Sequence, residues 1–309
     1  MKYTLRQMET FVAVARHESV SRAADELALS QSATSTALGE LERQFDTQLF
    51  DRIGRALRLN ELGQVVLPHA VQLIEHAREI ESLLSRQTDF GPLQIGATLT
   101  VGNYLATLIA SDFLRRHPSA RVRLSVHNSA IIVDQLTRYE LDLGLIEGTV
   151  RHPDLLVEPW VEDELVVFCA PGHPLAQAAH PVSLDELMKH EWILREPGSG
   201  TRETVDQALR HYTGELRVRL ELEHTEAIKR TVESGLGIGC ISRLALREAF
   251  RRGSLIPVEV PELDLRRQFQ FVTHRRKHVT AGMREFIALC RQMTAGVSRS
   301  DLISLPFIP

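Results

Sequence analysis

Cysteine is scarce in this sequence, with only Cys169, Cys240 and Cys290 among 309 residues. The three lie far apart in the chain, each in apolar surroundings, and their number is not the even count of a secreted disulfide framework. We therefore interpret them as buried free thiols rather than as redox centres or metal ligands.

Long apolar runs and an excess of charge are also missing. No stretch approaches the roughly 18 apolar residues of a membrane span, and the N-terminus lacks the apolar segment of a signal peptide, so we expect a cytoplasmic protein without membrane contact. The formal net charge is −4, which argues against nucleic-acid binding over the whole surface. Any contact with DNA must therefore be local and geometric.

The signatures of common catalytic sites do not occur. The sequence has no G-x-S-x-G, no H-E-x-x-H and no P-loop lysine motif. Glycines from Gly235 to Gly239 imitate part of a dinucleotide fingerprint, but they follow a predicted helix and precede a predicted strand, the reverse of what phosphate binding needs. His274 and His278 lie in a basic run that we interpret as a solvated turn rather than a metal site. We predict no enzyme, no catalytic residue, no cofactor and no metal.

The stretch from Ser19 to Phe45 has the pattern of two short helices joined by a tight turn. A first amphipathic helix precedes it, and Ser30 is placed to cap the second helix of the pair. On a helical wheel, Ala33, Ala37, Leu41 and Phe45 form an apolar arc, with Thr34 and Leu38 at its edges.

The opposite arc of this helix is polar and carries small side chains. Short hydroxyls let a helix approach base edges closely, the amide of Gln31 suits adenine, and Arg43 can reach phosphate. A plain solvated helix face is the alternative interpretation. A short basic strand pair around Gly54 favours DNA, because it has the form of a wing beside a helix-turn-helix. The residues that we predict to bind DNA are Gln31, Ser32, Ser35, Thr36, Arg43, Arg52 and Arg55.

Asn60 is placed to cap one long helix from Glu61 to about Gln87. Its apolar residues follow nearly heptad spacing, and no neighbour in sequence would cover them. We expect a second copy of the chain to cover this stripe. The stripe consists of Leu62, Val66, Ala70, Leu73, Ala77, Ile80 and Leu84.

These elements, in this order, resemble the LysR-type transcriptional regulators. The motifs SRAADELALSQSATS, LERQF and QLFDR carry the resemblance over the first 90 residues, and the rest follows by architecture. Glu18 and Asp46 stand where the family usually has glycine, and Asn60 where it has threonine. The resemblance implies a homodimer through the long helix, a homotetramer built as a dimer of dimers, and double-stranded DNA with an interrupted palindrome as partner.

From Gly91 onward, strands and helices alternate as in a doubly wound α/β fold, and two such sets resemble a periplasmic-binding-protein-like effector domain with two lobes. Two separate strands are expected at Leu155 to Trp160 and at Leu165 to Ala170. The predicted domains are residues 1–60 for the winged helix-turn-helix, 61–90 for the linker and dimerisation helix, and 91–309 for the effector-binding domain. Lobe I is predicted to comprise 91–162 and 267–309, and lobe II 163–266.

Ligands of open α/β sheets bind at the carboxyl ends of strands, where helix N-termini point their free amides. Hydroxyl-rich helix starts occur there in both lobes, which suits a small anion with Arg202 as counter-charge, whereas Glu147 favours a ligand that carries a proton. Simple helix capping is the alternative for each hydroxyl. The predicted effector-binding residues are Thr98, Thr100, Asn128, Glu147, Ser199, Thr201, Arg202 and Thr225.

The sequence from Glu140 to Gly148 is similar to the branch of the family that includes regulators of sulfur assimilation and of carbon fixation. By that resemblance, a sulfite- or sulfate-like anion is the expected effector. Two functions remain open: a ligand-responsive DNA-binding regulator, or a small-molecule-binding α/β protein or enzyme whose N-terminal module dimerises without touching DNA.

Overall fold

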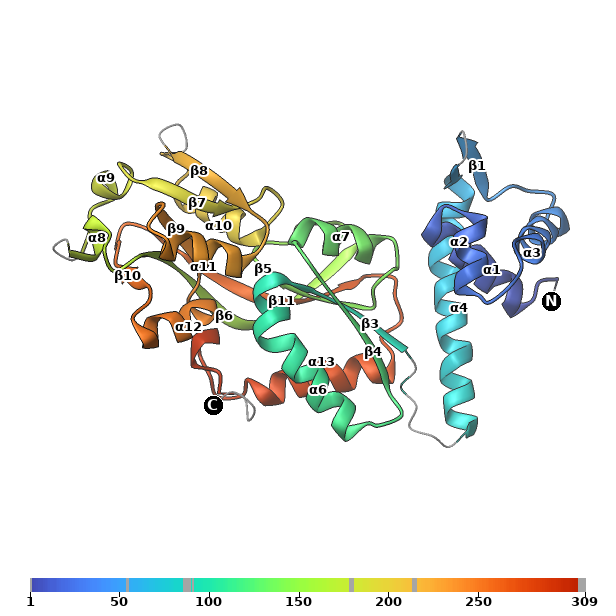
Figure 1. Cartoon of the computed structure of the whole chain (residues 1–309). Helices are drawn as coiled ribbons and strands as arrows, with labels where there is room; N and C mark the ends of the chain where they lie inside the picture. The colour runs from blue at the N-terminus through green and yellow to red at the C-terminus, as the bar shows by residue number, and fades with distance from the viewer. Residues whose placement is uncertain are drawn as a thin grey trace.

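A winged helix-turn-helix followed by one long helix forms the N-terminal part of the computed structural model (Figure 1). The structure describes residues 2–53, 56–85, 90, 92–177, 181–212 and 216–304. The two wing strands pair antiparallel. The elements are α1 (Leu5–His17), α2 (Val20–Glu26), α3 (Gln31–Gln44), β1 (Phe50–Ile53), β2 (Ala56–Leu59) and α4 (Glu61–Ser85).

The apolar faces of α1, α3 and α4 meet in one small core. Phe11 of α1 is completely buried in it, and α3 contributes Leu38 and Leu41. Thr34 is also completely buried, and its hydroxyl donates to the carbonyl of Ser30 at 3.1 Å. This bond satisfies a polar group that would otherwise be costly to bury.

Two residues of α3 that were expected in the core are exposed. Ala33 lies at the surface, and Phe45 keeps 48% of its area accessible. The buried stripe is centred instead on Thr34, Leu38 and Leu41. Both stripes have helical spacing, so the choice between them depended on which side of α3 the other helices cover.

The two positions where glycine is usual in the family both have a left-handed backbone. Glu18, which ends α1, has φ 49°, and Asp46, just after α3, also has φ 49°. Such a conformation is strained for residues other than glycine, although Asp tolerates it better than most. Glu18 has a second contact, because its carboxylate accepts from Arg58 of the wing at 2.6 Å.

The long helix α4 has one apolar face that is buried and another that is exposed to solvent. Leu67, Val71 and Ile74 are buried against the rest of the N-terminal domain. Ala70 of the predicted stripe is buried in the same core, so the chain itself covers part of that stripe, contrary to expectation. Leu62 and Ile80 stay 43% and 56% exposed and belong to the stripe predicted to meet a second copy; Leu84, of the same stripe, is 78% exposed. No helix among the described residues is long and apolar enough to cross a membrane.

The rest of the chain is a two-lobed α/β domain, as expected. Its strands form one sheet with the order β4-β3-β5-β11-β6-β9-β7-β8, and β10 pairs with β6. The strands are β3 (Pro92–Thr98), β4 (Arg121–His127), β5 (Leu143–Glu147), β6 (Leu155–Cys169), β7 (Glu191–Arg195), β8 (Arg217–Leu222), β9 (Ile238–Ser242), β10 (Ile256–Val258) and β11 (Arg266–His274).

Helices cover both parts of this sheet, and each part has its own apolar core (Figure 1). The helix α12 was missed by sequence reasoning. The helices are α5 (Leu99–Val101), the π-helix η1 (Gly102–Ala106), α6 (Thr107–Arg116), α7 (Ser129–Thr137), α8 (Pro174–Gln177), α9 (Leu184–Leu187), α10 (Gly200–Ala208), α11 (Thr225–Glu233), α12 (Arg243–Arg252), α13 (Ala281–Met293) and the 3-10 helix η3 (Ser300–Leu302).

The strand β6 joins the two lobes. Its first part pairs antiparallel with β11, with Glu164 opposite Arg266, and its second part pairs with β9, starting with Leu165 opposite Ser242. The expectation of two separate strands here is wrong, because β6 continues unbroken while its partner changes. Residues near this exchange therefore lie between the lobes.

Candidate functional site

The polar face of α3 is presented to solvent as the sequence predicted. The hydroxyl of Ser30 accepts from the amide of Ala33 at 3.1 Å and so fixes where the helix starts. With Thr34 and Leu38 turned inward, the other side of the helix stays free of protein contacts that would bury it. The exposed residues on it are Gln31, Ser32, Ser35, Thr36 and Arg43.

Only one of the two arginines predicted to bind DNA from the wing lies among the described residues. Arg52 on β1 is exposed, whereas Arg55 lies outside the described residues. Arg58 on β2 is exposed but is paired with Glu18, which ties the wing to the end of α1. A phosphate contact by Arg58 would therefore have to compete with this ion pair.

The second candidate site is a polar cluster between the lobes, centred on Glu147. This carboxylate ends β5 and is 2% exposed. It accepts from the hydroxyls of Thr98 at 2.8 Å and Thr100 at 3.1 Å, both at the carboxyl end of β3. The amide of Val101 is a third donor at 3.3 Å. Three predicted residues from the ends of two neighbouring strands are thus brought together.

Arg267 at the start of β11 joins this cluster to the other lobe. Its Nε donates to Asp163 of β6 at 2.7 Å, and one terminal nitrogen donates to the hydroxyl of Thr201 in α10 at 2.9 Å. The other terminal nitrogen donates to the hydroxyl of Thr100 at 3.4 Å, and the nitrogen that contacts Thr201 lies 3.9 Å from Glu147 Oε1. Burying such charges is costly unless they are paired and hydrogen-bonded, which explains why so many polar groups converge here.

Sequence reasoning missed Arg267 and Asp163. A signal was present: in β11, Arg267 is two and four residues from Phe269 and Phe271, so the alternation of a strand puts all three on one face. All three are indeed buried. The hydroxyls of Ser242 and Ser300, which lie far from Asp163 in sequence, both donate to its carboxylate, and nothing local predicts that meeting.

The remaining predicted residues have different surroundings. Ser199 is 2% exposed, caps nothing with its side chain, and its hydroxyl has no hydrogen-bond partner among the described residues. Asn128 caps α7 and donates to Glu196 at 3.2 Å. Thr225 is buried at the start of α11, without a side-chain hydrogen bond to the cluster within the described part of the chain.

Arg202 is not the counter-charge of the cluster. Its guanidinium donates to Asp206 at 2.9 Å and pairs with Glu221, on its own lobe. These carboxylates raise the pKa of Arg202 although burial opposes them. A cavity of about 430 Å³ lies between α7 of one lobe and α10 of the other, and Ser199 and Arg202 are among its lining residues.

The turn after β11 differs from the solvated basic turn that was expected. Lys277 is buried, and its ammonium contacts Glu75 at 2.7 Å and Asp142 at 2.9 Å. His274 is buried too, and burial lowers its pKa to about 4. His274 and His278 form no common site, because the first is packed inside and the second faces α4.

The cysteines are free and buried, as predicted. Burial raises the pKa of Cys169 to about 11 and that of Cys240 to about 12, and it raises the pKa of Cys290 as well. The reactive thiolate form is thus disfavoured at neutral pH.

Comparison with known proteins places both regions. Residues 5–64 match the family of bacterial regulatory helix-turn-helix proteins of the lysR type, and residues 86–295 match the LysR substrate binding domain. The HTH-type transcriptional regulator YeiE of Escherichia coli is 42% identical over 290 residues, which cover 94% of this chain and 98% of that protein. The RuBisCO operon transcriptional regulator of Allochromatium vinosum is 33% identical over 292 residues, covering 93% and 96%.

Solved structures agree in fold. Full-length OxyR from Pseudomonas aeruginosa matches with a TM-score of 0.71 at 21% identity, covering 94% of this chain and 93% of that one. The regulatory domain of CcmR from Synechocystis, solved in complex with 2-PG, matches with a TM-score of 0.62 at 27% identity, covering 67% of this chain and 99% of that one.

The matched domains and relatives are transcriptional regulators, not enzymes. This chain belongs to the LysR family of transcriptional regulators, in the branch that includes the RuBisCO operon regulators.

Proposed function

We propose that this regulator senses a small, protonated oxyanion, sulfite- or sulfate-like, between its two lobes and reads DNA with the exposed face of α3. The observation that carries the effector proposal is the convergence of Arg267 with the hydroxyls of Thr100 and Thr201, one from each lobe. The likeness to the CcmR regulatory domain solved with 2-PG is a further support.

The charges in the cluster limit which anion fits. Glu147 and Asp163 face the single guanidinium of Arg267, which leaves one negative charge in excess. A fully ionised oxyanion would add to this excess, whereas one that keeps a proton can donate to Glu147 in place of a threonine hydroxyl, and that hydroxyl can then donate to the anion. The hydroxyl of Ser199 at the start of α10, which has no hydrogen-bond partner in the described part of the chain, is a further donor. Hydrogensulfite satisfies these demands better than sulfate.

Calorimetric titration tests this proposal. Sulfite is expected to bind more tightly than sulfate, and Thr100→Ala and Thr201→Ala are each expected to weaken binding by about 1 to 2 kcal/mol, the usual loss for a charge-assisted hydrogen bond. Thr204→Ala is the matched control, because among the described residues that hydroxyl bonds only to the carbonyl of Gly200, within its own helix, at 2.8 Å. Unchanged affinity in both cluster variants would show that the anion binds elsewhere.

For DNA, the proposed readers are Gln31, Ser32, Ser35, Thr36 and Arg43 on α3, with Arg52 and Arg55 on the wing. The exposure of the five α3 residues supports this role, because hydroxyls and an amide on a narrow helix face match base edges in the major groove. Helices presented by two copies related by a two-fold axis would read an interrupted palindrome.

Mobility-shift titrations on the DNA upstream of the coding region test the assignment of this face. Ser35→Asp and Thr36→Asp are each expected to reduce affinity at least about tenfold, because a carboxylate is repelled by phosphates. Ser111→Asp adds the same charge at an exposed position of α6, far in sequence from the polar face of α3. This variant is expected to bind DNA as the wild type does. Equal binding by all variants contradicts the assignment.

The homodimer is proposed to form through α4, with the homotetramer as a pair of such dimers. The exposed Leu62, Ile80 and Leu84 support it, because isolated apolar stripes on a long helix need a cover. Ile80→Glu with Leu84→Glu is expected to shift the sedimentation coefficient toward the monomer. Leu114→Glu on α6, at a residue 38% exposed, is the control. Unchanged sedimentation of the double variant would place the dimer contact elsewhere.

A further inference from the structure

The loop between β11 and α13 is fastened to the linker helix α4. Lys277 in this loop is buried and reaches Glu75 of α4 at 2.7 Å, and the backbone amide of His278 donates to the same carboxylate at 3.2 Å. The loop is thus held to one residue of α4 by a side-chain contact and a backbone contact. The side chain of His278 is thereby directed along α4.

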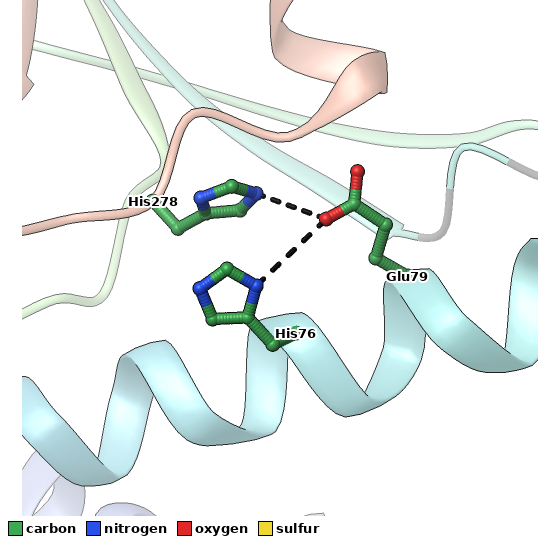
Figure 2. Close-up of side chains that lie close together, drawn as sticks. All are labelled: His76, Glu79 and His278. Carbon is green, nitrogen blue, oxygen red and sulfur yellow. Dashed lines mark hydrogen bonds and ion pairs between the residues drawn. The ribbon is translucent and has the colours of Figure 1, made fainter.

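Three groups that commonly bind metal ions meet next to this contact. His76 and Glu79 are three residues apart and therefore lie on one side of α4. Figure 2 shows the ring of His278 above that of His76, with the carboxylate of Glu79 facing both. His278 Nε2 lies 3.1 Å and His76 Nδ1 lies 3.9 Å from Glu79 Oε2. The two rings have their centroids 4.3 Å apart.

We propose that His76, Glu79 and His278 form a binding site for a divalent transition-metal ion such as Zn²⁺. One ligand atom from each residue lies within 4.8 Å of the others. In a tetrahedral zinc site, bond lengths near 2.1 Å put neighbouring ligand atoms about 3.4 Å apart, so only small side-chain rotations are needed. Two imidazoles and one carboxylate favour Zn²⁺, Ni²⁺ or Cu²⁺ over Mg²⁺ and Ca²⁺, and water would take the fourth position.

The surroundings permit an ion to enter. The side chains of His76, Glu79 and His278 are 57%, 34% and 25% exposed, so the site opens to solvent. Arg284 faces the other oxygen of Glu79 at 4.0 Å and is itself 56% exposed, so it can turn away. Since α4 supplies two ligands and the effector domain one, a bound ion would fasten the linker helix to that domain.

The test is calorimetric titration of Zn²⁺ into the untagged full-length chain after removal of metals by a chelator. One site per chain is expected, and His76→Ala and His278→Ala are each expected to weaken binding about tenfold or more, since each removes a ligand. His69→Ala is the matched control, because His69 is exposed two turns earlier on α4. Mg²⁺ is expected not to bind.

Thermal unfolding is a second measurement. Zn²⁺ is expected to raise the Tm of the wild type and of His69→Ala, because an ion that binds only the folded state stabilises it, and to raise it less in the two ligand variants. Absence of zinc binding, or equal affinity in the ligand variants and the wild type, overturns the proposal. The DNA and anion titrations are done without metal, so their outcomes are independent of this one.

Discussion

Small hydroxyl side chains gather in two regions of this protein, and they serve opposite purposes. On α3, Ser32, Ser35 and Thr36 are exposed to solvent, although the hydroxyl of Ser32 also bonds to that of Ser30 at 3.0 Å. Between the lobes, Thr100 and Thr201 are buried and already bind the charges of Glu147 and Arg267. The same residue types thus face water in one region and replace water in the other. Burial, not composition, distinguishes the exposed face of α3 from the cluster that joins the two lobes.

The largest expected effect concerns the buried cluster between the lobes, where Arg267 balances two carboxylates. Arg267→Ala leaves Asp163 and Glu147 buried without their cation, so the free energy of unfolding should fall by about 3 to 5 kcal/mol in urea titrations. Arg266→Ala on the same strand removes an exposed pair with Asp264 and should leave the free energy of unfolding nearly unchanged. Similar losses in both variants would mean that the cluster contributes no special stability.

Neighbouring residues of α3 give the next largest effect. Thr34→Asp places a carboxylate where the side chain is completely buried, so we expect about 3 kcal/mol of destabilisation. Ser35→Asp, one position later and exposed, should change the free energy of unfolding by less than about 0.5 kcal/mol. Urea unfolding followed by circular dichroism measures both. A stable Thr34→Asp variant would contradict the assigned orientation of α3.

Acid should weaken the fold through His274. Burial lowers the pKa of this imidazole from its ordinary 6.5 to about 4, so between these values the unfolded chain binds a proton that the folded chain does not. Stability from this group is therefore complete above pH 6.5 and is lost as pH falls toward 4, by about 2 kcal/mol between pH 7 and pH 5. In His274→Phe, the difference between the free energies of unfolding at pH 7 and pH 5, measured by urea titration, should be smaller than in the wild type by about 2 kcal/mol. An unchanged pH dependence would place the titration in other groups.

The smallest expected effect concerns backbone strain. Asp46 has φ 49° and makes no side-chain hydrogen bond among the described residues, so Asp46→Gly should raise the free energy of unfolding by about 0.5 kcal/mol. Glu18→Gly should gain less, because it also loses the ion pair with Arg58. Thermal unfolding measures both. A loss of stability in Asp46→Gly would mean that its carboxylate has an unseen role.

Local patterns were enough to predict much of this protein. The caps Ser30 and Asn60, the polar face of α3 and the alternation of strands and helices depend on residues a few positions apart, and they appear in the structure as expected. The strand-end rule likewise brought Thr98, Thr100 and Glu147 together. Each of these follows from backbone periodicity, which a sequence displays directly.

Only the tertiary structure decided which charges meet. Arg202 and Arg267 both lie near the boundary between the lobes. The first pairs with Asp206 and Glu221, whereas the second pairs with Asp163. Likewise His278 meets His76 across some 200 residues of chain. Such meetings depend on how strands far apart in sequence pair and how helices pack on them. The sequence by itself therefore determined the exposed polar face of α3 and the two-lobed α/β architecture, and the packing decided which charges pair between the lobes.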